Sequence, residues 1–194
     1  MSLTKSQMLP LGTQAPYFNL TDVVSGKTFN LNDFKDKKGL LVMFICRHCP
    51  FVKHVQKEIA KIGKDYASRD VGIVAISAND PQAYPEDAPE SLRQQAEELE
   101  FNFPYLYDET QEIAKAYSAA CTPDFFLFDK EKTLIYRGQL DDSRPGKIWV
   151  KVDGRDLRFA LDSLFEDKEV SIEQKPSIGC SIKWKPGNLP DYFK

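Results

Sequence analysis

The sequence predicts an α/β fold in which a central mixed β-sheet is flanked by helices. Two continuous apolar runs, at residues 40–45 and 71–76, have the length of strands that are covered on both faces. Residues 51–66, between them, have the apolar periodicity of an amphipathic helix. This order of elements predicts a right-handed crossover between parallel strands. Runs at 125–128 and 133–136 predict an antiparallel hairpin, which makes the sheet mixed.

The first 35 residues combine turn signals with short extended segments. Residues 16–20 alternate as an edge strand does, residues 25–27 read as a turn, and residues 28–31 are extended again. We therefore expect an N-terminal β-hairpin extension.

Three prolines between residues 81 and 89 predict an irregular loop, most simply at the surface. Helices are expected at 90–99, 109–117 and 155–165, with a short segment at 103–107 between the first two. The helix at 155–165 has the clearest apolar periodicity of the three.

A chain of 194 residues fits one domain. We assign residues 1–166 to that domain and residues 167–194 to an irregular C-terminal tail, because the tail has little periodicity. An exposed tryptophan is uncommon in a free tail, so Trp184 predicts that the tail packs on the domain.

Composition places the chain among ordinary globular proteins, with 42% hydrophobic and 28% charged residues. The net charge of −3, with both signs spread along the chain, does not favour nucleic acid or a membrane surface as a partner. The longest apolar run is too short to span a bilayer, and the first residues lack a secretory signal. We expect a soluble, cytoplasmic protein.

Cys46 and Cys49 stand where a buried strand ends and a helix begins. A helix N-terminus carries partial positive charge and unpaired amides, so it stabilises a thiolate, which is the reactive form of cysteine. With two residues between them, one cysteine can attack a substrate disulfide and the other can resolve the mixed disulfide. This spacing predicts a catalytic dithiol, in which we assign the attack to Cys46 and the resolution to Cys49.

Arg47 and His48 separate the two cysteines. Both can place positive charge near Cys46, so we expect a lowered pKa there and a relatively oxidising pair. Pro50 fits the first helical turn, which needs no backbone donor.

Two other interpretations of the pair remain open: buried core thiols, and half of a zinc site. Zinc usually needs a second nearby pair, whereas Cys121 and Cys180 are far apart in the sequence. Haem attachment would need a histidine directly after Cys49, where Pro50 stands. The sequence therefore predicts neither a metal nor a cofactor.

The chain resembles the thioredoxin superfamily, in particular the redoxin branch related to alkyl hydroperoxide reductase and thiol-specific antioxidant proteins. The resemblance covers about residues 10–165 and includes the Cys-x-x-Cys motif and a later Thr-Pro before a strand hairpin. Its other matching segments are Gly12–Asp22, Gly26–Lys27, Leu31–Phe34 and Leu41–Phe44. It implies a thioredoxin-like fold, a cis Pro123 beside the redox pair, and a Thr122 whose backbone binds a thiol substrate.

Three departures from the thioredoxin pattern concern the active site. Ile45 replaces a tryptophan, Arg-His replaces Gly-Pro, and Leu40 stands where thioredoxins bury an acid. The proton acceptor is therefore open, with His48, His54 and Asp80 as candidates.

Met43 and Gly39 occupy the positions where peroxiredoxins carry a threonine and a proline before the reactive cysteine. Direct peroxide reduction by this site is therefore disfavoured.

Cys121 adjoins Thr122-Pro123, and Cys180 lies in the tail. Cys121 is most simply a semi-buried free thiol. The alternative is that Cys121 is a third redox thiol, which exchanges with the main pair or with Cys180. A tail folded over the active site would supply Cys180 as a resolving thiol.

The function we predict is that of a thiol–disulfide oxidoreductase acting on protein or small-molecule disulfides or thiols, with a separate thiol reductant. The alternatives are a thiol peroxidase and a non-catalytic metal-binding or redox-sensing module. Peroxide consumption and metal analysis distinguish them.

Overall fold

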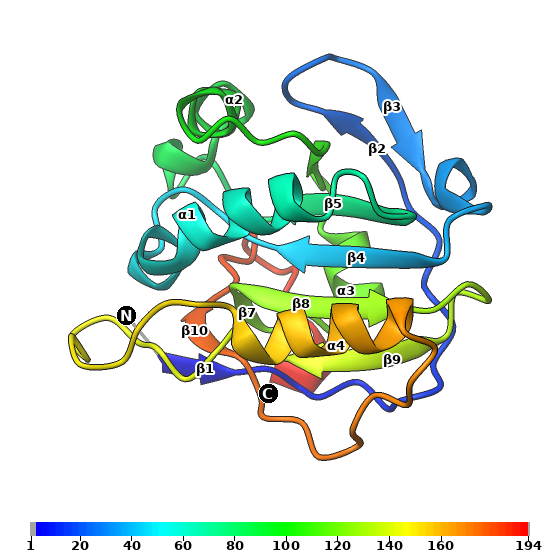
Figure 1. The fold of residues 1–194 in the computed structure, drawn as a ribbon. Coiled ribbons are helices and arrows are strands. Elements are labelled where there is room, and N and C mark those ends of the chain that lie inside the picture. The colour runs from blue at the N-terminus through cyan, green and yellow to red at the C-terminus, as the bar shows by residue number, and fades with distance from the viewer. Residues whose placement is uncertain (1–2, 194) are drawn as a thin grey trace.

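The computed structural model describes residues 3–193 and is built around a seven-stranded sheet (Figure 1). Strands β4, β5 and β6 are parallel, and the remaining neighbours are antiparallel. The predicted mixed sheet and the N-terminal hairpin are thus confirmed. In spatial order the strands are β3 (Thr28–Asn30), β2 (Asn19–Asp22), β6 (Tyr105–Tyr107), β5 (Val71–Ser77), β4 (Gly39–Phe44), β8 (Asp124–Phe128) and β9 (Leu134–Gly138).

Strand β4 is buried over its whole length because both of its faces are apolar. Successive side chains of a strand point to opposite faces. Leu41 and Met43 accordingly enter one hydrophobic cluster, and Val42 and Phe44 enter the other. The strand therefore lies in the middle of the core, and the residue that follows it is held firmly.

Helices cover both faces of the sheet, as predicted. The first cluster is covered by α1 (Pro50–Asp65), α2 (Pro89–Glu98) and α4 (Arg155–Phe165). The shorter α3 (Glu112–Ala116) packs on the opposite face (Figure 1). Single 3₁₀ turns lie at Leu31–Phe34, Pro85–Asp87 and Asp191–Phe193. Of these, Pro85–Asp87 is the one that reaches the cysteine motif.

The expectation of an irregular C-terminal tail was wrong in one segment. A second, three-stranded sheet consists of β1 (Leu3–Lys5), β10 (Ile178–Ser181) and β7 (Cys121–Thr122), all antiparallel. Strand β10 is its middle strand. The pairing partners are far apart in the sequence and the strands have two to four residues, so local periodicity does not predict these strands.

Beyond β10, the tail stays in contact with the rest of the chain. The backbone N–H of Ile182 donates to the carbonyl of Ala120 at 3.0 Å. Trp184 packs against the second hydrophobic cluster. These contacts fix β10 from its C-terminal side.

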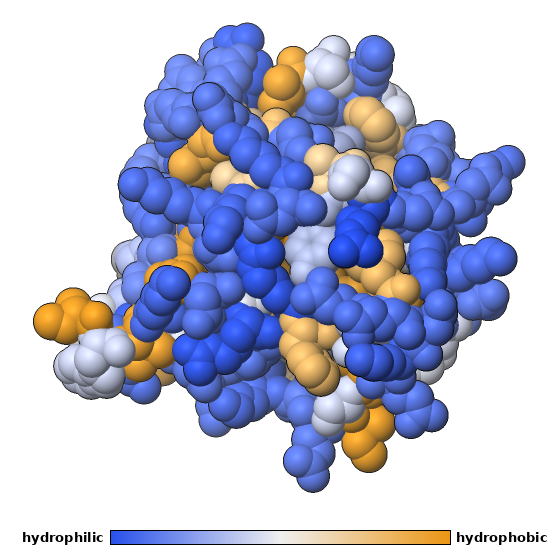
Figure 2. Space-filling model, viewed as in Figure 1, coloured by the Kyte–Doolittle hydropathy of each residue, from blue (hydrophilic) through white to orange (hydrophobic). Residues whose placement is uncertain are grey.

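The loop between β9 and α4 carries apolar side chains that face solvent, with Ile148 93% and Trp149 78% exposed. It projects at the left of Figure 1, and the same corner of Figure 2 is orange. Parts of this loop line a groove together with Phe51 and Ile178. An apolar surface therefore adjoins the N-terminus of α1.

Among residues 3–193, no helix has the length and apolar character that crossing a membrane requires.

Replacing Gly179 by alanine is expected to disrupt the pairing of β10 with β7. The added Cβ would lie 2.7 Å from the carbonyl carbon of Thr122 and closer still to its oxygen. We expect a loss of about 2 kcal/mol in the free energy of unfolding, measured with urea. The control is Gly187→Ala, where the Cβ meets nothing within 4 Å and only the positive φ costs about 1 kcal/mol. Equal losses in the two variants would contradict this assignment.

Candidate active site

The Cys-x-x-Cys motif lies in the short connection between β4 and α1. Cys49 is the N-cap residue of α1, and Pro50 is its first helical residue. Both Cys46 and Cys49 are completely buried. The second thiol therefore lies at the helix N-terminus, where backbone amides favour a negative charge.

Thr122 contacts both thiols. Its Oγ1 lies 3.2 Å from the Sγ of Cys46, and its carbonyl oxygen accepts a hydrogen bond from the Sγ of Cys49 at 3.3 Å. The Thr122–Pro123 peptide bond is cis, as the family resemblance implied. Residues more than 70 positions apart in the sequence thus meet at one point.

Cys46 does not have the lowered pKa that the sequence led us to expect. Burial, a hydrogen bond with Cys49 and the nearby carboxylate of Asp87 raise the pKa of Cys46 well above its ordinary value. Hydrogen bonds from Cys46, Cys180 and the backbone of Val52 outweigh burial at the other cysteine and lower the pKa of Cys49 to about 5. Cys49 is therefore the more acidic thiol of the reduced pair, and as a thiolate it no longer donates to the carbonyl of Thr122.

Arg47 does not supply positive charge to Cys46 either. Its guanidinium donates to the carbonyl oxygen of Ser91 in α2 at 2.6 Å and forms an ion pair with Glu98 at 3.2 Å. The side chain is long enough to reach the neighbouring helix, where an acid compensates its charge. Arg47 therefore ties the motif to α2.

Asp87 is the site residue that sequence analysis missed. Its carboxylate is fully buried and accepts hydrogen bonds from the backbone N–H groups of Arg47 and His48, at 2.8 and 3.0 Å. It also accepts from Nδ1 of His48 and, at 2.8 Å, from the amide of Asn79. Nothing local distinguishes Asp87 from the exposed Glu86 beside it, because its role depends on where the 3₁₀ turn docks.

These hydrogen bonds set the ionisation of Asp87. Burial alone would raise its pKa, but hydrogen bonds from His48 and Asn79 hold the pKa below its ordinary value. The imidazole of His48 stacks on Tyr84, with ring centroids 4.7 Å apart, and its Nδ1 lies 3.8 Å from the Sγ of Cys46. An anionic carboxylate thus orients the imidazole beside the first thiol.

The same atoms are close enough to serve as metal ligands. The Sγ of Cys46, a ring nitrogen of His48 and a carboxylate oxygen of Asp87 all lie within 4.8 Å of one another. A metal ion there would have to replace the hydrogen bond between His48 and Asp87.

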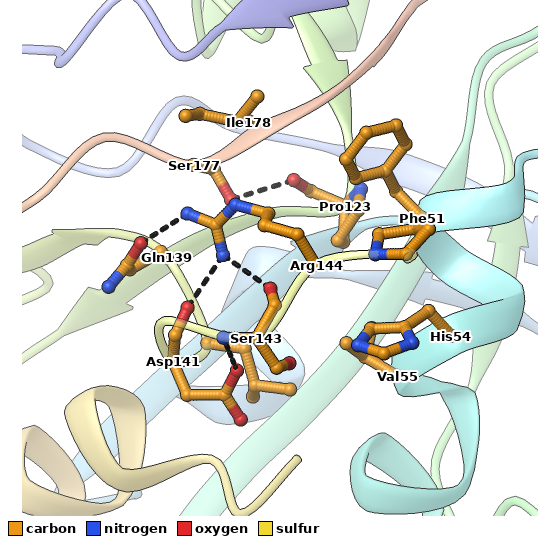
Figure 3. A pocket seen from close by; sticks show the side chains of 12 residues that line it. Phe51, His54, Val55, Pro123, Gln139, Asp141, Ser143, Arg144, Ser177 and Ile178 are labelled. Atoms are coloured by element: carbon orange, nitrogen blue, oxygen red, sulfur yellow. Dashed lines mark hydrogen bonds between the residues drawn. The ribbon is translucent and has the colours of Figure 1, made fainter. Parts of the chain in front are cut away.

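The other two candidates for a proton acceptor lie elsewhere. Oδ1 of Asp80 accepts from the backbone of Gln82 at 3.0 Å. His54 lines a small pocket beside Pro123 and faces Ser143 (Figure 3). Its Nε2 is buried and has no hydrogen-bond partner within residues 3–193. Neither Asp80 nor His54 is among the side chains that contact the two motif thiols, so Asp87 and His48 are the groups placed for proton handling.

The two remaining cysteines have different positions. Burial raises the pKa of Cys121, whose Sγ contacts the carbonyl of Pro123 at 3.8 Å. Cys180 is directly opposite Thr122 in the β10–β7 pair, and its thiol is hydrogen bonded to Cys49. Burial, together with that bond, raises the pKa of Cys180 to about 12. Cys180, unlike Cys121, thus belongs to the group of thiols around Cys49.

Replacing Thr122 by valine is expected to make Cys46 less acidic. The threonine hydroxyl lowers the pKa of Cys46, and valine keeps the shape without the donor. One hydrogen bond to a charged group is worth about 1.5 kcal/mol, so alkylation of Cys46 at a fixed pH should slow about tenfold. The measurement is the pH profile of iodoacetamide labelling, read by peptide mapping. An unchanged profile would contradict this role.

Known proteins share sequence and fold with this chain. The model of the AhpC/TSA family matches residues 11–137. Thiol-disulfide oxidoreductase ResA of Bacillus thuringiensis subsp. konkukian (strain 97-27) is 27% identical over 132 residues, which are 68% of this chain and 71% of that protein. Its counterpart in Geobacillus kaustophilus (strain HTA426) is 28% identical over 130 residues, 66% of this chain and 68% of that protein.

Solved structures extend the similarity over nearly the whole chain. An uncharacterized conserved protein from Geobacillus kaustophilus is 56% identical, with a TM-score of 0.94 and coverage of 96% of this chain and 98% of that chain. A hypothetical protein from Sinorhizobium meliloti 1021 is 48% identical, with a TM-score of 0.92 and coverage of 95% and 100%. A putative thioredoxin from Neisseria meningitidis, 22% identical over 81% of this chain and 93% of that chain, shares the fold with a TM-score of 0.61. The chain has a thioredoxin-like fold and belongs to the AhpC/TSA family.

Proposed function

We propose that the chain is a thiol–disulfide oxidoreductase and that Cys46 and Cys49 are its exchanging pair. The observation that carries the proposal is the hydrogen bond between these two thiols at the N-terminus of α1, where both also contact Thr122. Two sulfurs held together in this way can form and break a disulfide without a change of fold. The name of the ResA relatives is consistent with this activity.

Cys46 is the thiol that attacks the substrate. Both thiols are buried, but Cys49 is hydrogen bonded to Cys180 on its other side and caps the helix, whereas Cys46 lies in the connection that precedes it. The thiolate of Cys49 is hydrogen bonded to Cys46, and transfer of the Cys46 proton to it produces the attacking thiolate as the minor form of the pair. The thiolate formed on Cys46 then attacks one sulfur of the substrate disulfide, and the other sulfur leaves as a thiolate.

The second step releases the reduced substrate. Cys49 gives up its proton to the departing thiolate or to the adjacent pair of His48 and Asp87, and attacks the sulfur of Cys46 in the mixed disulfide. The Cys46–Cys49 disulfide forms, and the substrate leaves as one thiol and one thiolate, which takes a proton from water. The substrate gains the two electrons that the protein loses, so an external thiol reductant is needed for the next cycle.

A trapping experiment tests these roles. In Cys49→Ser the mixed disulfide cannot be resolved, so oxidised glutathione should give a stable adduct at Cys46. In Cys46→Ser no adduct can form at position 46, and release of reduced glutathione should be much slower than in the wild type. If the glutathione in Cys49→Ser is attached to a cysteine other than Cys46, the proposed order of attack is refuted.

Peroxide reduction is the second candidate, since the chain belongs to the AhpC/TSA family. Met43 and Gly39, at positions where the resemblance implies a threonine and a proline in peroxiredoxins, weigh against it. Consumption of hydrogen peroxide in the presence of a thiol reductant separates it from disulfide exchange.

We propose that the substrates are protein or small-molecule disulfides or thiols and that the protein works in the cytoplasm. A chain of this size does not need disulfides for its stability, and a reducing compartment would keep its buried cysteines as thiols.

A further inference from the structure

The edge of the active site that carries Thr122 is already paired with a strand of the same chain. Cys180 of β10 is the antiparallel partner of Thr122, and Ser181 is the partner of Cys121. Thr122 is the residue next to the motif thiols, and it contacts both of them. Strand β10 thus pairs with the backbone of Thr122 directly beside the dithiol.

Several contacts hold β10 close to that edge. Gly179 has no side chain to keep it away from the carbonyl of Thr122, which any Cβ would overlap. Ser177 donates its hydroxyl to the carbonyl of Pro123 at 2.8 Å. After the strand, the backbone N–H of Lys183 donates to Asn79 at 2.8 Å, and Asn79 in turn holds Asp87. The strand is therefore fixed at both ends relative to the motif.

This position brings a third thiol to the exchanging pair. Residues directly opposite each other in an antiparallel pair have side chains on the same face, with Cβ atoms about 5 Å apart. The side chain of Cys180 therefore points to the face from which Thr122 contacts Cys46, and its thiol is hydrogen bonded to Cys49. All three thiols lie in one buried cluster, with Cys49 between the other two.

We propose that Cys180 is a catalytic residue that exchanges with the Cys46–Cys49 disulfide and forms an intramolecular Cys49–Cys180 disulfide. The proposal rests on the proposed function, because it starts from the disulfide which that function produces.

The exchange is balanced without any other reactant. The Sγ of Cys180, as a thiolate, attacks the Sγ of Cys49 in the Cys46–Cys49 disulfide. The bond between Cys49 and Cys180 forms, and the bond between Cys46 and Cys49 breaks. Cys46 leaves as a thiolate and takes up the proton that Cys180 lost. One disulfide is present before and after, so the oxidation state of the protein does not change.

The consequence is a second oxidised form with a different reactivity. With the disulfide between Cys49 and Cys180, Cys46 is again a thiol beside His48 and can react with another disulfide. In this form β10 is also covalently joined to the first residue before α1. The attacking thiol is then regenerated before any external reductant arrives.

Cys121 provides the matched control, because it belongs to the same strand as Thr122 but is on the opposite face. Its sulfur contacts the carbonyl of Pro123. Replacing Cys121 by alanine removes a buried thiol of the same small sheet and leaves the cluster of Cys46, Cys49 and Cys180 unchanged.

Tryptic mapping under non-reducing conditions tests the proposal. Trypsin cleaves after Arg47, so Cys46 and Cys49 fall on different peptides, and Cys121 and Cys180 fall on two others. The full-length protein and its Cys46→Ser, Cys180→Ser and Cys121→Ala variants are oxidised with excess oxidised glutathione, quenched with acid and mapped.

We expect Cys46→Ser to contain the Cys49–Cys180 peptide pair in most molecules, and Cys121→Ala to match the wild type. Cys180→Ser should contain the Cys46–Cys49 pair and no other. If Cys46→Ser yields only glutathione adducts at Cys49, the inference is overturned, whereas a Cys46–Cys49 pair in the wild type leaves the proposed function intact. If instead the wild type never forms a Cys46–Cys49 pair, the proposed function itself fails.

Mapping of the wild-type protein provides a second test, which does not depend on correct folding of the Cys46→Ser variant. In the wild type, partial reduction with dithiothreitol should reveal both Cys46–Cys49 and Cys49–Cys180 pairs at ratios that do not depend on protein concentration. Complete absence of the second pair at every ratio contradicts the exchange.

Discussion

Replacing Cys49 by serine is expected to abolish catalysed disulfide exchange, leaving only the rate of the reductant alone. The thiolate of Cys49 has a pKa lowered to about 5, it is the base for Cys46, and it resolves the mixed disulfide. Serine keeps the size of the side chain but can neither ionise near neutral pH nor form the disulfide. Reduction of insulin by dithiothreitol, followed by turbidity, measures the effect.

Cys121→Ala is the control for this loss, because it removes a thiol of similar burial that does not contact the exchanging pair. It should keep turnover within about twofold of the wild type, since it leaves the reacting groups in place. Turnover by Cys49→Ser at a substantial fraction of the wild-type rate would contradict a two-cysteine mechanism.

Replacing Asp87 by alanine is expected to cause the largest loss of stability among single substitutions near the site. The carboxylate is fully buried and accepts four hydrogen bonds, from Arg47, His48 and Asn79. Removing the carboxylate leaves these donors, which include the buried side chains of His48 and Asn79, without an acceptor, and this costs about 3 kcal/mol. Urea unfolding at pH 7 measures the change.

Glu86→Ala is the matched control, because Glu86 is the adjacent acid but is exposed and pairs only with the exposed Lys53. Such a pair contributes about 0.5 kcal/mol. Similar losses for the two variants would mean that the position in the 3₁₀ turn matters and the buried carboxylate does not.

The loss caused by Asp87→Ala should also depend on pH. Because the pKa of Asp87 is lower in the folded protein than in the unfolded chain, its contribution to stability is complete above the unfolded value of about 3.9. The contribution falls as the pH drops through the folded pKa. The difference in unfolding free energy between the wild type and Asp87→Ala should therefore be constant from pH 8 to pH 5 and shrink below about pH 4. A difference that is unchanged at pH 3 would contradict the assignment.

The parts of the fold that sequence predicts well are those set by local patterns. The apolar runs that became β4 and β5 and the periodicity of α1 and α4 depend on neighbouring residues alone. Strands β1 and β10 have three and four residues and pair across more than 170 positions, so their pattern is too short to read. The prediction of an irregular tail was wrong at β10 for this reason.

The same distinction applies to the site. The spacing of Cys46 and Cys49 and their place before a helix are local, and they identified the thiol pair. The contacts of Asp87 and Cys180 with that pair are set by docking of a 3₁₀ turn and of β10. The direction of Arg47 toward α2 is likewise a tertiary contact, and it is why the expected positive charge is not at Cys46.

A relatively oxidising pair remains a prediction, but its expected origin changes. A reduced form stabilised by a thiolate at Cys49 raises the potential, as one at Cys46 would have done. Arg47 positions the motif through its contact with α2, and His48 does so through its hydrogen bond with Asp87.

The reduction potential of the Cys46–Cys49 pair tests the central claim most directly. The protein is equilibrated with a series of glutathione ratios, quenched with acid and mapped with trypsin, and the Cys180→Ser variant is used so that one disulfide is observed. The account predicts a reversible, two-electron Cys46–Cys49 disulfide with a potential above about −270 mV, the value of thioredoxin. Thiols at both positions at every ratio would contradict it.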